Sequence, residues 1–112
     1  MTESITRTVL ADIALARATT VERIETRRIR IPAGVAAGLH IHNCPVVGSI
    51  VEGSVAYQVE GEPVVTLAPG DMFYEAEGAR IARFDALDGD VEFIAHFLLA
   101  AGQQPELDFP DT

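Results

Sequence analysis

Lysine and tryptophan are absent from the 112-residue chain, and cysteine occurs only once, at Cys44. A single cysteine cannot form a disulfide within the chain, which fits the reducing environment of the cytoplasm. No stretch approaches the roughly 18 apolar residues of a transmembrane helix. The first twenty residues also lack the uninterrupted apolar segment of a secretory signal, because Asp12 lies within it. We therefore expect a cytoplasmic protein.

Positive charge is scarce as well. The chain has eight basic residues, all of them arginine, against 17 acidic residues, and its net charge is −9. A surface of this sign repels nucleic acid and anionic membranes, so we expect neither as a partner. The hydrophobic fraction of 48% is normal for a globular protein, and the length corresponds to one domain.

Short segments of β type begin near residue 23 and continue to residue 99. Residues 55–60 alternate between apolar and polar side chains, and residues 91–99 form the longest apolar segment. Turns rich in glycine, proline and aspartate separate the segments at intervals of about 8–12 residues. This pattern predicts a small antiparallel barrel or sandwich.

The sequence divides into an N-terminal arm (1–22), a barrel (23–101) and a polar C-terminal tail (102–112). Within the arm, residues 9–17 are compatible with a short helix or with a strand and loop that pack on a partner. Ile24 and Ile29 have opposite parity in the first predicted strand, which suggests a β-bulge or an irregular edge strand. The tail, with two prolines, is expected to run over the surface or fray.

His40 and His42 are the most informative residues. Residues two apart on a strand point to the same side, so two imidazoles here can face one metal ion. Alternatively, they are barrel histidines that form hydrogen bonds with neighbouring groups or with water. Ligand contact of some kind is the favoured interpretation.

The spacing around these histidines resembles the first motif of the cupin superfamily. The motif has a glycine, five residues, His-x-His, three or four residues, a glutamate, six residues and a glycine. This chain has Gly34, His40, His42, Val46 and Gly53 at those positions. Val46 therefore stands where the family has a glutamate ligand.

A second segment, Pro69-Gly70-Asp71 followed by Met72-Phe73-Tyr74, is similar to the first half of the second cupin motif. The histidine of that motif would fall at Arg80 or Ile81, so it too is replaced. The resemblance covers about residues 24–100 and identifies a small single-domain cupin.

The resemblance implies an all-β fold, a double-stranded β-helix or jelly-roll barrel in a single domain, with the histidines in its mouth. It also implies a homodimer, since small cupins commonly pair and can exchange N-terminal strands. A cupin site holds iron, manganese, nickel, zinc or copper on three histidines and a glutamate. We therefore expect a divalent metal at His40 and His42, in an incomplete site that needs a further ligand.

His96 is the first candidate for that ligand. It shares a strand face with Ile94 and Leu98, and would reach the metal if this face lines the barrel. The alternative is a core or interface histidine bonded to a backbone group. Cys44 could turn inward as a thiolate, or it could be a small buried apolar side chain.

Other residues are candidates for binding a small molecule. Arg80 could hold a substrate carboxylate through two hydrogen bonds, or it could pair with a surface acid. Tyr57 and Phe73 could line a pocket, or they could belong to the core. Glu75 and Glu77 are expected in a solvated loop near the mouth, and no catalytic residue can be named.

Two functions follow. The first is a cytoplasmic cupin that binds a small polar or carboxylated molecule and acts as a metal-dependent isomerase, lyase or dioxygenase. The second is a metal-free cupin that serves as a non-catalytic ligand-binding or sensing module, with Val46 and Ile81 making the ligand sphere apolar. The sequence leaves open whether the protein is an enzyme.

Overall fold

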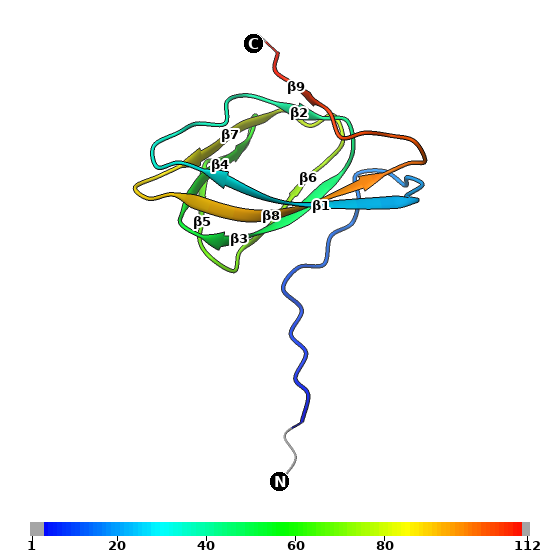
Figure 1. Cartoon of the computed structure of the whole chain (residues 1–112), viewed down its shortest axis with the longest axis horizontal. Helices are drawn as coiled ribbons and strands as arrows, with labels where there is room; N and C mark the ends of the chain where they lie inside the picture. The colour runs from blue at the N-terminus through cyan, green and yellow to red at the C-terminus, as the bar shows by residue number, and fades with distance from the viewer. Residues whose placement is uncertain (1–3, 111–112) are drawn as a thin grey trace.

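The computed structural model describes residues 4–110, which form nine strands and no helix (Figure 1). This range accordingly contains no helix that could cross a membrane. The strands are β1 (Arg23–Ile31), β2 (Ile41–His42), β3 (Val46–Glu52), β4 (Val55–Val59), β5 (Val65–Leu67), β6 (Met72–Glu75), β7 (Ile81–Ala86), β8 (Val91–Leu99) and β9 (Leu107–Asp108).

The strands form two principal sheets that face each other across the core. One sheet has the order β1-β8-β3-β6, the other β5-β4-β7, and β2 pairs with β9 in a small third sheet. All of these pairings are antiparallel. The arrangement is a single-domain jelly-roll barrel, which confirms the all-β fold predicted from the short, turn-separated segments.

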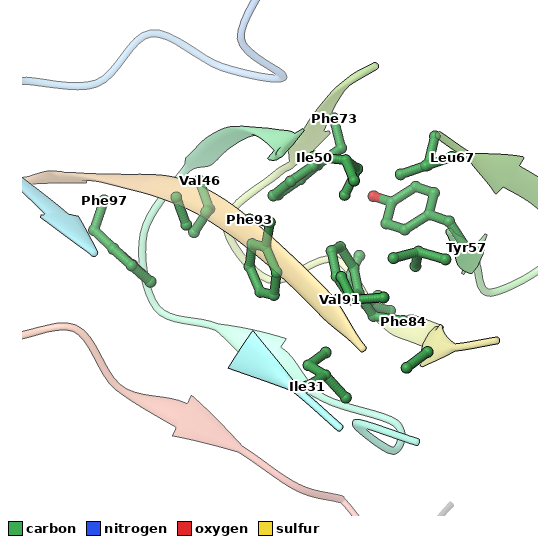
Figure 2. Packing of buried hydrophobic residues seen from close by; sticks show 14 of the residues in the cluster. Ile31, Val46, Ile50, Tyr57, Leu67, Phe73, Phe84, Val91, Phe93 and Phe97 are labelled. Atoms are coloured by element: carbon green, nitrogen blue, oxygen red, sulfur yellow. The ribbon is translucent and has the colours of Figure 1, made fainter. Parts of the chain in front are cut away.

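The core lies between the sheets and is rich in aromatic side chains. Along β8 every second residue is buried, so Phe93 and Phe97 point inward. Phe93 contacts Phe84, with ring centroids 4.7 Å apart, and Phe73 lies against both rings (Figure 2). Large, offset and edge-to-face aromatic contacts of this kind stabilise the packing beyond simple area burial.

The first strand differs from its prediction. Its register with β8 is unbroken from Arg23 to Ile31, so there is no bulge within it. Ile24 simply faces outward and is 61% exposed, whereas Ile29 and Ile31 face the interior. The parity change arises because the strand carries apolar residues on both of its faces, and a bulge is not needed to explain it.

The N-terminal arm is extended and projects away from the barrel (Figure 1). The suggested helix over residues 9–17 is therefore not formed. The Ala16 amide donates a hydrogen bond to the Tyr74 hydroxyl, and Arg17 pairs with Glu77, so the second half of the arm lies beside the end of β6. Residues 1–3 of the predicted arm and 111–112 of the predicted tail lie outside the described range.

Gly48 allows β3 to lie between β8 and β6. A Cβ atom there would come within 2.3 Å of the Ile94 carbonyl oxygen and 2.5 Å of the Phe73 ring. We predict that Gly48→Ala destabilises the protein by about 1–3 kcal/mol through overpacking. Gly89→Ala is the matched control, because no atom lies within 4 Å of its Cβ position. Urea unfolding of both variants tests this, and equal midpoints would contradict it.

Candidate metal centre

Three buried side chains that could ligate a metal meet at one end of the barrel. His42 belongs to β2, His40 precedes β2 and forms an isolated bridge with Ile81, and Glu75 ends β6. The Gly78 amide donates to the His42 carbonyl at 3.0 Å, which ties β2 to the turn after β6. Ligand atoms of His40, His42 and Glu75 all lie within 4.8 Å of one another.

The histidine orientations suit coordination. The His42 Nε2 atom lies 2.7 Å from Glu75 Oε1, and the His40 Nε2 atom lies 3.4 Å from the same oxygen. His40 Nδ1 is 2.7 Å from the Gly38 carbonyl. Because a carbonyl can only accept, Nδ1 carries the proton and the lone pair of the neutral ring is on Nε2. A second hydrogen bond of this kind commonly fixes metal-binding histidines.

Contacts within this group shift the pKa values of Glu75 and His40. Burial would raise the pKa of Glu75, but its contacts with His40 and then His42 outweigh burial and leave the pKa below its ordinary value. Burial would likewise lower the pKa of His40, yet the interactions with Glu75 and the Gly38 carbonyl raise it overall. Glu75 is thus favoured as a carboxylate, the form that binds a cation.

The prediction that Glu75 lies in a solvated loop is wrong. It is the last residue of β6 and is only 3% exposed. Its cross-strand partner in β3 is Val46, the residue at the position of the missing cupin glutamate. Directly opposed residues share a face of the sheet, with Cβ atoms about 4.5–5.5 Å apart. The carboxylate therefore comes from the neighbouring strand.

His96 does not join this group. Phe93, Ala95 and Phe97 are the buried side of β8, so His96 lies on the outer face of the sheet. Its Nδ1 atom is 2.8 Å from the hydroxyl of Thr26, its partner on β1. The condition under which His96 would reach the metal, that its face lines the barrel, is not met.

Cys44 also stays apart from the histidines and Glu75. It is 1% exposed and belongs to the hydrophobic core. Burial, followed by the charge of Glu77, raises the pKa of its thiol. It therefore matches the alternative of a small buried apolar side chain.

The predicted ligand-binding residues separate into two groups. Phe73 lines the cavity beside the histidines. Tyr57 packs in the core against Phe73 and Phe84, and its hydroxyl donates to the Tyr74 carbonyl at 3.3 Å. Arg80 pairs with Glu60 through Nε at 2.8 Å, so the alternative of a surface ion pair describes it.

A cavity of about 380 Å³ opens onto the candidate metal centre. Most of its wall is apolar and comes from β1, β6, β7 and β8, whereas His40, His42 and Glu75 form a polar patch. Its volume is near the lower end of the range for pockets that bind small organic molecules.

The C-terminal segment closes one side of this cavity. Leu107 and Phe109 line it, and the Phe109 ring centroid is 6.4 Å from that of His40. Asn43 holds the segment: its side chain donates to the Gln104 carbonyl and accepts from the Glu106 amide, both at 2.9 Å. The sequence predicts a tail that runs over the surface or frays; most of the described tail is exposed, and it also lines the cavity.

Comparison with known proteins supports the fold. No protein-family model matches the chain, and neither does any curated protein. Among solved structures, the DMSP lyase DddQ from Ruegeria pomeroyi has a TM-score of 0.68 and 22% identity, covering 80% of this chain and 45% of that protein. An oxalate oxidase has a TM-score of 0.66 and 17% identity, covering 77% and 45%.

A cupin-like protein from Thermotoga maritima has a TM-score of 0.66 and 18% identity, and the match covers 80% of this chain and 67% of that one. The chain thus has the cupin fold, as its two motif segments suggested. It spans less than half the length of the matched lyase and oxidase.

The burial of Cys44 has a chemical consequence. Thiolate is the reactive form, so a buried thiol with a raised pKa should react slowly. We predict that Ellman's reagent at pH 8 modifies the native protein at least about tenfold more slowly than the urea-unfolded protein. Equal rates would show that Cys44 is accessible.

Proposed function

We propose that His40, His42 and Glu75 bind a divalent metal ion and that the protein uses it to bind a small molecule in the adjoining cavity. The observation that carries this proposal is the convergence of two imidazoles and one carboxylate, all buried, with ligand atoms within 4.8 Å. Two histidines and one carboxylate are typical of non-haem iron(II) sites and of some catalytic zinc sites.

The residues fit such an ion in charge as well as in position. Glu75 is favoured as a carboxylate, and the Gly38 carbonyl fixes His40 with Nε2 directed at Glu75. Phe97 packs against the His42 ring at 5.9 Å and limits its rotation. A bound divalent ion would supply Lewis-acid polarisation of a ligand oxygen.

The chain's own residues would contribute three things to a reaction at this site. Gly38 and Phe97 orient the imidazoles, the apolar wall excludes water, and the C-terminal segment encloses the bound molecule. More specifically, we propose that the reaction is an isomerase, lyase or dioxygenase reaction. The lyase and oxidase with similar folds support it by analogy alone.

A metal-free binding module is the second candidate. The 2.7 Å hydrogen bond between His42 and Glu75 satisfies both buried groups without an ion. Val46 and Ile81 also make two positions of the resembled ligand sphere apolar. In that case the cavity alone would recognise the ligand.

Metal analysis separates the two candidates. Protein purified without an affinity tag, and offered iron, manganese, nickel, zinc and copper in turn, should retain about one ion per chain of at least one metal. His40→Ala/His42→Ala and Glu75→Gln should each lose it, because the remaining ligands are too few. His96→Ala is the matched control and should retain it.

Two results would count against the metal site. A wild-type protein that retains none of the metals supports the binding module. Full metal content in the double histidine variant would place any metal elsewhere in the chain. Circular dichroism of each variant confirms that loss of metal is not loss of folding.

We also propose that two copies of the chain form a homodimer through the outer face of the four-stranded sheet. This face carries apolar side chains on neighbouring strands, including Ile24, Val47 and Leu98. The arm adds Ile5 and Val9, which are 77% and 80% exposed. Exposed apolar side chains on one sheet face and on the neighbouring arm favour an interface here.

Light scattering after size exclusion tests the dimer. We predict a dimer for the wild-type protein and a monomer for Ile24→Glu, which buries a charge at the interface. Val64→Glu is the matched control, because Val64 is similarly exposed but lies between β4 and β5. A monomeric wild-type protein would refute the proposal.

A further inference from the structure

The wall of the cavity restricts the chemistry of what it can hold. Away from the candidate metal centre most of the lining is aliphatic or aromatic and includes Ile29, Ile31, Val35, Phe84 and Phe93. The charged residues that line the cavity there are Arg27, Arg30 and Glu106. The aliphatic and aromatic side chains cannot replace the hydrogen bonds that a polar ligand makes with water. A molecule with polar groups along its whole length would lose hydration there without compensation.

Two further residues that line the cavity have apolar side chains that are largely exposed to solvent. Leu107 and Phe109 line the cavity, yet they are 50% and 59% exposed. The strand pairing of β9 with β2 holds them beside the histidines. An apolar ligand body would cover part of this surface, and burial of apolar area is favourable in proportion to the area removed from water.

Positive charge lies at the same cavity. Arg27 follows the inward parity of Ile29 and Ile31, and its guanidinium lies 5.0 Å from the centre of the Phe97 ring. Phe97 in turn contacts His42. The Arg27 guanidinium forms an ion pair with Glu25, to which its Nε atom donates at 2.6 Å, so part of its charge is already balanced.

We propose that the ligand is a small molecule with an apolar body and a single carboxylate. The proposal rests on the metal site proposed above, because a bound cation together with Arg27 would attract the carboxylate. The apolar body lies against the aliphatic and aromatic wall. Small, doubly charged acids, in which every part is polar, do not fit this distribution.

Calorimetric titration of the zinc-loaded protein tests the ligand class. The probes are butyrate, hexanoate and octanoate, with suberate as the eight-carbon diacid that matches octanoate in length. Affinity should rise about fourfold for each added methylene until the cavity is filled. Suberate should bind about tenfold or more weakly than octanoate, because its second carboxylate meets the apolar wall.

The NMR signals of the three histidines can show where the probe binds. Imidazole NMR signals of His40 and His42 should shift on addition of octanoate, whereas that of His96, on the outer face, should not. A shift confined to His96 would place octanoate outside the cavity and overturn the proposal.

Variants at exposed positions test the two parts of the ligand separately. Arg27→Gln should weaken octanoate binding about fivefold, in line with the loss of one charge-assisted contact. Arg28→Gln, the next residue on the same strand, faces outward and should have no effect. Phe109→Ser should weaken octanoate more than butyrate, because it removes apolar wall area.

The outcomes distinguish this inference from the metal site. If the protein holds its zinc but binds the acids without regard to length, or binds suberate as well as octanoate, the ligand class is wrong and the metal site stands. If octanoate binds equally well to protein without metal, with the expected dependence on length, the apolar part of the ligand class stands and the metal takes no part in holding the carboxylate.

Discussion

The short contact between His42 and Glu75 is the interaction on which the site depends. Both side chains are buried, and a carboxylate at 3% exposure requires a hydrogen-bond partner or a cation to offset its lost hydration. The contact joins β2 to β6, two elements from different sheets. It therefore sets the distance between the histidine pair and the end of the four-stranded sheet, where the cavity opens.

The carboxylate of the candidate metal centre comes from β6 and not from the motif position on β3. Val46 and Glu75 are directly opposed across β3 and β6, so their side chains occupy neighbouring places on the inner face. From its place beside Val46, the Glu75 carboxylate reaches His42 at 2.7 Å. The register between β3 and β6, and not the spacing of one sequence motif, therefore decides whether a carboxylate lies beside the two histidines.

Much of the fold, and less of the site, could be predicted from the sequence. The parity of His40 and His42 placed both rings on one side, and both are buried. Glu75 was missed because the predicted strand ended one residue early. Its two-residue separation from the buried Phe73 was the available signal. His96 was misplaced because β8 is apolar on both faces, so alternation alone could not identify its inner side.

The remaining surprise, the C-terminal segment, has a physical cause that spacing could not reveal. Its residues pair with only two residues of β2, and further hydrogen bonds to it come from Asn43 and from the guanidinium of Arg23. Two residues of β2 pair with β9, whereas nine residues of β1 pair with β8. Segments with few buried contacts and exposed backbone hydrogen bonds open at low free-energy cost. In the described chain, the sheet with the fewest paired residues thus carries His42 and borders one side of the cavity. We therefore expect local opening of the C-terminal segment to cost less free energy than opening of the four-stranded sheet.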